Sequence, residues 1–411
     1  MSAAVNARPT LSDEQRRLVN ALARSGDGVQ VIRAAAGTGK TFALDAAREA
    51  WHTSGVPVLG CALSARAACE LRDQGGVDAT TIAGLRRAFE RGIELAPGSV
   101  LIVDEAGMAG TRDLAVLADA AELAHTKLVL VGDDRQLPEI EAGGAFRALA
   151  RRLGAIELHE VHRQREPWDR DALAALRRGD VERFAVAYHA HGRGIAAPNA
   201  DAARAALVND WWRAHKAGER ALMIAHRRAD VADLNRRARA LLRDTGRVGP
   251  DVAGAGGRPF GVGDRVVTTR NERRLAVVNG QAGALTGHDG DRVRVELDAG
   301  RHADLPASYA QEHLGQAYAT TAHRAQGATV DRAFVLGSDE LHREWGYTAL
   351  SRHRHEARFY VATGCEFLNK APEPLRDGDV PIHVAQLLRD SRAERLALDR
   401  ASRDSGLGLG P

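Results

Sequence analysis

The segment 31–41, VIRAAAGTGKT, constrains the fold most, because an apolar run leads through a loop of small residues directly into Lys-Thr. A buried strand, a glycine-containing turn and a helix start in this order surround an anion with backbone N–H groups and the positive end of the helix. In such a loop the lysine reaches the β- and γ-phosphates of a nucleotide, and the threonine hydroxyl ligates Mg²⁺. The predicted phosphate loop consists of Ala36, Gly37, Thr38, Gly39, Lys40 and Thr41.

Two positions of this loop bear on the prediction. The usual spacing places a glycine at position 34, where this chain has Ala34, and a methyl group fits there if the backbone stays in the α or β region. Lys40 differs from the composition of the chain, which has 53 arginines and four lysines. A compact ammonium suits a phosphate cradle better than the wider guanidinium fork. The lysine therefore supports a phosphate site.

Two more apolar runs end in polar residues. VLIVDEAGM at 100–108 contains Asp104, a candidate Mg²⁺ ligand, and Glu105, a candidate base for the attacking water. LVLVGDDRQLPEI at 128–140 contains Gln136, which could contact the γ-phosphate or the water, and Asp133, which could anchor the loop. Either segment alone could be a solvated polar loop. Together with a phosphate loop about 65 residues upstream, the pair of acids predicts ATP hydrolysis with Mg²⁺.

The chain alternates between short apolar runs and helical patterns, which predicts α/β units with parallel sheets covered on both faces. The first such unit spans about 1–155, and a second resumes between about 156–244 and 313–370. A glycine-rich break at 248–264 introduces a small antiparallel β-module, predicted over 245–312 and inserted into the second unit. Residues 371–411 predict an exposed helix and a disordered tail.

Composition limits the class of protein. The chain of 411 residues has 44% hydrophobic and 27% charged residues, with neither a membrane span nor a secretory signal in its sequence. Cys61, Cys69 and Cys365 show no disulfide or metal spacing, which favours a reducing cytoplasm. A net charge of +3 permits nucleic-acid binding without arguing for it. Aromatic residues make up only 4%, and Trp211 and Trp212 are predicted to be helical core residues rather than base-stacking platforms.

Taken together, the motifs resemble a superfamily 1 helicase, and more closely the branch with the RecD-like exonuclease subunits and the helicase halves of conjugative relaxases. LSDEQ at 11–15 looks like the Q-motif, whose Gln15 would read adenine. HEVHRQ at 159–164 and YTALSRHR at 347–354 resemble the motifs that carry two arginines, Arg163 and Arg352, which touch the γ-phosphate. In AYATTAHRAQGATV at 317–330, the resemblance implies a nucleotide contact at Gly327.

The resemblance also implies the fold and the reaction cycle. It implies two RecA-like P-loop NTPase domains, a short 1B-like element at about 86–98, and an SH3-like β-barrel over 245–312. ATP would lie between the two domains, so an arginine from the second domain would sense the γ-phosphate only in the closed state, and opening after hydrolysis would move the DNA grips. The implied partner is single-stranded DNA, bound through its phosphates without sequence preference. The candidate DNA contacts are Ser64, Arg66, Thr81, Asn279, Thr320, Thr321 and His323.

Three functions remain open at this stage. The leading interpretation is a monomeric DNA helicase or translocase that moves 5′ to 3′, with a possible protein partner in DNA transfer or repair and no membrane association. A second is an ATPase switch or subunit that uses DNA as a regulator. The third, a non-catalytic remnant, disagrees with the complete set of nucleotide-site residues. The segment between Thr81 and Val100 leaves little room for a strand-separating hairpin. The segment 188–191, Tyr-His-Ala-His, favours a surface loop over a metal site.

Overall fold

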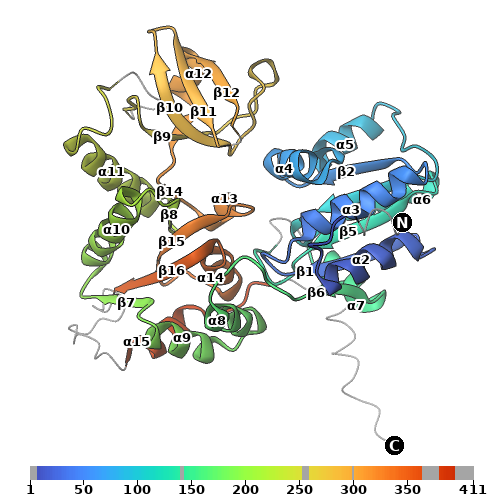
Figure 1. Cartoon of the computed structure of the whole chain (residues 1–411), viewed down its shortest axis with the longest axis horizontal. Helices are drawn as coiled ribbons and strands as arrows, with labels where there is room; N and C mark the ends of the chain where they lie inside the picture. The colour runs from blue at the N-terminus through green and yellow to red at the C-terminus, as the bar shows by residue number, and fades with distance from the viewer. Residues whose placement is uncertain (1–6, 139–142, 252–258, 299, 363–378, 394–411) are drawn as a thin grey trace, which may run out of the picture. The chain divides into compact units, whose positions relative to one another are not determined.

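The computed structural model describes residues 7–138, 143–251, 259–298, 300–362 and 379–393. The chain divides into two compact units, residues 1–163 with 392–411, and residues 164–391. Both units are α/β, as the alternating pattern predicts (Figure 1).

The first unit is built on a six-stranded sheet in which every strand pair is parallel, with the order β3-β2-β4-β5-β1-β6. Its strands are β1 (Val29–Ala34), β2 (Val58–Ala62), β3 (Asp78–Thr81), β4 (Val100–Asp104), β5 (Lys127–Gly132) and β6 (Ala155–Leu158). Its helices are α2 (Asp13–Arg24), α3 (Lys40–Thr53), α4 (Ala65–Gly75), α5 (Ile82–Phe89), α6 (Thr111–Leu123) and α7 (Ala145–Arg152). The apolar runs of the sequence thus coincide with the strands.

Successive strand residues of this sheet point into two different cores, because side chains alternate between the faces of a strand. Ile32 and Ile102 pack on the side of α2 and α3, whereas Val31 and Leu101 pack on the side of α6 and α7. The central strands are therefore apolar on both faces, which explains why they read as continuous hydrophobic runs.

The second unit contains a five-stranded parallel sheet with the order β14-β8-β15-β16-β7. Its strands are β7 (Gly194–Ala197), β8 (Ala221–Ile224), β14 (Ala319–Thr320), β15 (Val330–Leu336) and β16 (His353–Ala362). Its helices are α8 (Pro167–Arg178), α9 (Val181–Ala190), α10 (Ala200–Lys216), α11 (Arg228–Asp244), α13 (Ala322–Ala325), α14 (Arg343–Leu350) and α15 (Val380–Leu387). Trp211 and Trp212 are buried in α10, which confirms their predicted place in the core.

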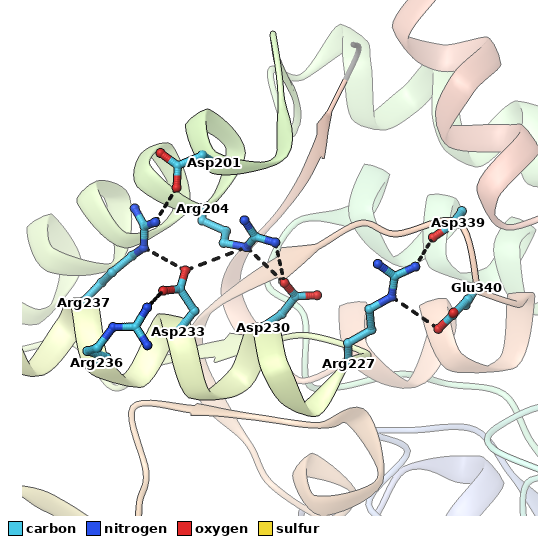
Figure 2. Close-up of polar contacts among 9 residues, drawn as sticks. All are labelled: Asp201, Arg204, Arg227, Asp230, Asp233, Arg236, Arg237, Asp339 and Glu340. Atoms are coloured by element: carbon cyan, nitrogen blue, oxygen red, sulfur yellow. Dashed lines mark hydrogen bonds and ion pairs between the residues drawn. The ribbon is translucent and has the colours of Figure 1, made fainter. Parts of the chain in front are cut away.

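Helices α10 and α11 are joined by a network of arginines and carboxylates, which Figure 2 shows together with a separate cluster at Arg227. Arg204 of α10 pairs with Asp230 of α11 at 2.8 Å, and Arg237 of α11 pairs with Asp201 of α10 and with Asp233. These partly exposed pairs fix how the two helices lie side by side, although each exposed pair contributes little stability.

An antiparallel module interrupts the second unit between β8 and β14. Its sheet has the order β12-β11-β10-β9-β13. Its elements are β9 (Arg265–Thr268), β10 (Ala282–His288), β11 (Arg292–Leu297), β12 (His302–Pro306), α12 (Ala307–His313) and β13 (Leu314–Gln316). It has its own core, which includes Phe260, Val295 and Leu305. The predicted β-module is therefore present, and its SH3-like classification stays a prediction.

Three details differ from the expectations or fall outside the described residues. The segment 188–191 lies at the end of α9, with His191 as its C-cap, rather than in a surface loop. Helix α15 is not fully exposed, because Val384 and Leu388 are buried, the latter against Gly346 of α14. The predicted tail after residue 393 and Cys365 lie outside the described residues, and the helices that are described include none long and apolar enough to cross a membrane.

Candidate functional site

The phosphate loop connects β1 to α3 as predicted. Gly37 and Gly39 have φ values of 84° and 70°, which L-residues with a side chain rarely adopt. A Cβ atom on Gly39 would lie 2.5 Å from Nε2 of Gln15, so the loop passes directly over that side chain. The Gln15 amide donates to the carbonyl of Thr38 at 2.9 Å. The glycines therefore provide both the backbone turn and the space that this loop needs.

Gln15 is placed by the start of α2. Ser12 caps this helix and forms a reciprocal capping box with Gln15, whose Oε1 accepts from the Ser12 N–H at 3.0 Å. Gln15 thus has its amide oxygen on its own helix and its amide nitrogen on the phosphate loop. Gln15 therefore links α2 to the phosphate loop, and its contact with adenine stays a prediction.

Lys40 begins α3, and its ammonium forms an ion pair with the carboxylate of Asp104 at the end of β4. Burial lowers the pKa of Lys40, but the carboxylates of Asp104 and Glu105 outweigh burial and raise the pKa above its ordinary value. Lys40 therefore stays cationic at neutral pH, as an interaction with phosphate requires.

Glu105 has both an unusual backbone conformation and a shifted side-chain pKa. Its φ of 56° lies in the left-handed region, and its N–H donates to Oδ1 of Asp104 at 2.8 Å. Desolvation raises the pKa of Glu105 to about 7, Lys40 opposes the rise, and Asp104 adds to it. Strained residues with perturbed acidity concentrate at functional sites. A carboxyl group with a pKa near 7 is well suited to general-base catalysis.

The strand ends that carry these side chains are neighbours, because β4, β5 and β1 are adjacent in the sheet. Asp133 follows β5 directly and accepts from the N–H of Arg135 and from Nε2 of Gln136, both at 3.2 Å. Asp133 therefore anchors its loop, as expected, and holds Gln136 at the same edge of the sheet. Close packing at this edge requires glycine, since a Cβ on Gly132 would lie 2.5 Å from the nitrogen of Gly107.

The residues at this edge fit a magnesium ion. Mg²⁺ prefers a few oxygen ligands from the protein and completes its shell with water and phosphate oxygens. Thr41 in the first turn of α3 and Asp104 at the end of β4 supply such oxygens, one neutral and one anionic. Asp104 is buried and hydrogen-bonded to Lys40. The candidate Mg²⁺ ligand and the lysine that would contact the phosphates therefore lie together.

Arg163 is placed differently from the expectation that the second domain supplies it. It is the last residue of the first unit, and a Cβ on Gly37 would lie 2.6 Å from the Cβ of Arg163. The preceding residue, His162, donates its N–H to the carbonyl of Gly37 at 2.9 Å. This hydrogen bond fastens the segment to the phosphate loop, which is why Arg163 belongs to the first unit.

Arg352 lies in the second unit at the turn between α14 and β16, and its side chain is only 2% exposed. Its Nε donates to the carbonyl of Thr348 at 2.7 Å, and its Nη2 donates to the Ser351 hydroxyl at 2.8 Å. These two hydrogen bonds hold the guanidinium within its own unit.

The candidate DNA contacts of the first unit lie at helix starts. Ser64 caps α4 and accepts from the N–H of Ala67 at 3.0 Å, and Thr81 caps α5 and accepts from the N–H of Gly84 at 3.0 Å. Arg66 pairs with Glu70 one turn further along α4. Because β2 and β3 are adjacent and parallel, the two capped helices start at the same edge of the sheet. Both hydroxyls thus have a structural role besides any contact with DNA.

The candidate contacts of the second unit lie mainly around β14. Thr320 ends β14, Thr321 is the residue before the short helix α13, and His323 is exposed on that helix. Gly327 follows α13 with a φ of 78°. Asn279 lies apart in the antiparallel module, where its N–H donates to Oδ1 of Asn271 at 2.7 Å.

Sequence reasoning missed a polar cluster next to β14. The strand β8 pairs with β14, and Arg227 at its end forms ion pairs with Asp339 at 2.6 Å and Glu340 at 3.4 Å (Figure 2). The two acids follow β15, which is also adjacent to β8. No spacing signal joins residues about 112 positions apart, so only the strand order reveals this pairing.

The chain is similar to several known proteins. The AAA domain family matches residues 10–199. The chain is 38% identical over 366 residues to a probable conjugal transfer protein TraA of Sinorhizobium fredii, covering 88% of this chain and 33% of that protein. It is 30% identical over 412 residues to the RecBCD enzyme subunit RecD of Mycobacterium tuberculosis, covering 85% of this chain and 69% of that subunit.

Among solved structures, the fold is similar to that of a Pif1 helicase from Bacteroides in complex with ADP-AlF3 and single-stranded DNA. The TM-score is 0.56 at 18% identity, and the match covers 97% of this chain and 98% of that one. This likeness concerns the fold. The chain spans about one third of the length of the TraA proteins that it matches.

Proposed function

Because the chain belongs to the RecD-like branch of the superfamily 1 DNA helicases, we propose that it is an ATP-driven motor that moves 5′ to 3′ along single-stranded DNA. The two parallel α/β units are RecA-like, in keeping with the fold shared with the Pif1 helicase. We propose that the first unit, up to Arg163, forms the first motor domain, that 164–244 with 313–362 forms the second, and that 245–312 is an inserted module; the predicted boundary at 155/156 therefore moves to 163/164, because β6 pairs with β1.

The observation that carries this proposal is the cluster of Lys40, Asp104 and Glu105 at one sheet edge. A lysine that stays cationic, an acid bonded to it, and a second acid with a pKa near 7 are the groups that phosphoryl transfer to water requires. Lys40 would exchange Asp104 for the β- and γ-phosphates of ATP. Glu105 would then take the proton of the attacking water, and Gln136 would orient that water.

The bound nucleotide would use further groups of the same loop. Mg²⁺, held by Thr41 and Asp104, would neutralise charge on the phosphate oxygens. Arg163, which lies beside Gly37, is positioned to follow changes in the phosphate loop. Arg352 would stabilise the charge that develops on the γ-phosphate, after leaving the carbonyl of Thr348 that holds it here.

Movement would follow from changing grips on DNA phosphates. We propose Ser64, Thr81 and Arg66 as contacts of the first unit, and Thr320, Thr321 and His323 as contacts of the second. Hydroxyls, backbone N–H groups at helix starts and single basic side chains bind phosphates without reading bases. Opening and closing of the nucleotide site would then shift the DNA contacts of one unit relative to those of the other.

The proposal is tested by ATP hydrolysis with and without single-stranded DNA, followed by strand displacement on duplexes with a 5′ or a 3′ tail. We expect hydrolysis to be stimulated by single-stranded DNA and displacement to require the 5′ tail. Displacement from the 3′ tail alone would reverse the proposed polarity. Hydrolysis that does not respond to DNA would exclude the motor.

One structural observation favours a second candidate, a DNA-stimulated ATPase that acts as a switch or subunit with little unwinding of its own. Residues 90–99, between α5 and β4, are all described and contain turns but no strand. A strand-separating hairpin therefore has no counterpart in this segment. Stimulation by DNA without displacement on either tail would support this second candidate.

A further inference from the structure

Gln164 follows Arg163 in the chain and is buried, with 2% of its surface exposed. A buried side-chain amide is costly unless its polar groups find partners. Its Nε2 donates to the carbonyl of Ser351 at 3.2 Å and to the carbonyl of His353 at 2.9 Å. These two carbonyls flank Arg352 on both sides. One amide therefore holds the backbone on either side of the candidate arginine finger.

Backbone hydrogen bonds extend this contact. The N–H of Arg165 donates to the carbonyl of Arg354 at 3.1 Å, and the N–H of Val330 donates to the carbonyl of Arg352 at 3.0 Å. The turn that carries Arg352 is thus fixed on one side by residues 164–165 and on the other by the start of β15. The side chain of Gln164 supplies the only contacts among these that a substitution can remove.

A second buried support holds the same turn. His353 is fully buried, and its two ring nitrogens lie 2.7 Å from the carbonyl of Leu350 and 2.6 Å from Oδ2 of Asp169 in α8. Asp169 also accepts from the Tyr188 hydroxyl at 3.1 Å. Buried hydrogen bonds therefore hold the turn to α8, and the side chain of Gln164 holds it from the other direction.

The geometry points to Gln164 as a positioning residue that carries the movement of Arg163 to Arg352. His162 and Arg163 lie on the phosphate loop through Gly37, and Gln164 is the next residue along the backbone. When the γ-phosphate leaves, a shift of the phosphate loop would move Arg163 and, through the next peptide bond, Gln164. The side-chain amide of Gln164 would then move the turn that carries Arg352. This inference rests on the proposed ATP hydrolysis and on Arg352 as its second arginine.

The test replaces Gln164 by methionine, which keeps the volume and removes the amide. We expect kcat for DNA-stimulated ATP hydrolysis to fall about 10- to 100-fold, with KM for ATP changed less than about threefold. Affinity for single-stranded DNA without nucleotide should stay unchanged. Tyr360→Phe is the matched control, because it removes one partly buried hydrogen bond of the same unit, to Asp210 at 2.7 Å, away from this turn.

A double-mutant cycle separates positioning from a general structural role. If Gln164 acts through Arg352, Gln164→Met should lower kcat by less than about twofold in an Arg352→Ala background, since the group it positions is already absent. Fully additive losses would overturn the inference, and so would wild-type kinetics of Gln164→Met in an active enzyme. If Gln164→Met does not fold, Gln164→Leu, which also removes the amide, replaces it in the same cycle with the same expected outcomes. Inactivity of the wild-type chain with DNA and ATP would instead exclude the proposed function itself.

Discussion

The two units hold their key cations in opposite ways. The side chain of Lys40 in the first unit is 30% exposed and pairs with a carboxylate, whereas that of Arg352 in the second unit is 2% exposed and donates to a carbonyl and a hydroxyl. Lys40 can exchange one anion for another when phosphate arrives. Arg352 must first leave neutral partners inside its own unit. The first cation is therefore ready to bind, and the second requires a rearrangement of its surroundings.

This difference has an electrostatic consequence. The pair of Lys40 and Asp104 brings opposite charges together next to Glu105, so removal of the lysine leaves two uncompensated carboxyl groups. The partners of Arg352 that hold it at Thr348 and Ser351 carry no charge. Substitution of Lys40 should therefore change the chemistry through charge, whereas substitution of Arg352 also removes buried hydrogen bonds of its own unit.

The largest effect is expected from the first unit. Lys40→Ala and Glu105→Gln should each lower the rate of ATP hydrolysis by ~10³ or more, because one removes the phosphate contact and the other the base. Glu105→Gln should still bind ATP, whereas Lys40→Ala should bind it weakly. Single-turnover hydrolysis and titration with a fluorescent ATP analogue measure the two steps separately. Hydrolysis at the wild-type rate by Glu105→Gln would show that another group is the base.

Arg352→Ala tests the second unit. We expect kcat to fall by about 10³, the lower range for an arginine finger, while affinity for single-stranded DNA stays unchanged. Because the side chain is buried and bonded to the carbonyl of Thr348, the melting temperature should also fall, by an amount that corresponds to roughly 1 to 3 kcal/mol. Loss of DNA binding in Arg352→Ala would assign Arg352 to the DNA site instead.

The pH dependence sharpens the assignment of Glu105. A base must be ionised, and the pKa of Glu105 is raised to about 7. In the hydrolysis-limited regime, kcat should therefore fall about tenfold per pH unit below about 7. Arg352→Ala should keep the same pH profile at a lower rate. A profile that is flat down to pH 5 would contradict a raised pKa in the active state.

The same shift predicts a change in stability. The folded-state pKa of about 7 lies above the ordinary value of 4.5, so ionisation of Glu105 destabilises the folded protein. The destabilisation is absent below pH 4.5, grows as the pH rises from 4.5 to about 7, and is complete above about pH 7. Glu105→Gln should therefore raise the free energy of unfolding at pH 8 by roughly 1 to 3 kcal/mol, with a higher melting temperature, and leave both nearly unchanged at pH 4.5. Equal effects at both pH values would contradict this coupling.

The two regions also differ in how far the sequence predicted them. The site around Lys40, Asp104 and Asp133 was predictable. Each of these residues follows a short apolar run that marks a strand, and parallel strands bring their ends together at one edge of the sheet. The surroundings of Arg352 were not predictable, because the turn that carries it is held by main-chain carbonyls, which bind the amide of Gln164 about 187 positions away from Ser351. Main-chain atoms are the same at every position, so no residue pattern marks them.

Arg163 is a second example of a contact that the sequence does not predict. Its motif was identified from a resemblance, but its unit was not, because the hydrogen bond that fastens it joins two main-chain groups, His162 N–H and Gly37 carbonyl. The pairing of Arg227 with Asp339 and Glu340 depends in turn on the order of β8 and β15, which hydrophobic periodicity does not reveal. Motifs with local signals were predictable, and contacts set by strand order or main-chain atoms were not.

The smallest expected effect concerns the candidate DNA contacts of the first unit, where a hydroxyl has both a structural and a proposed functional role. Ser64→Ala removes the cap of α4 and should cost about 1 kcal/mol of stability. It should weaken DNA binding only a few-fold, since one neutral phosphate contact contributes about 0.5 to 1.5 kcal/mol. Loss of the cap and loss of a contact cannot be separated by this variant alone.

Ser64→Asp separates them, because aspartate caps helices as well as serine does but repels a phosphate. We expect it to keep the melting temperature of the wild type and to bind single-stranded DNA more weakly than Ser64→Ala, with the difference decreasing as salt is added. Fluorescence anisotropy with a labelled oligonucleotide at two salt concentrations measures this. If Ser64→Asp binds DNA as tightly as the wild type, Ser64 is only a cap, and the DNA path of the first unit lies away from the start of α4.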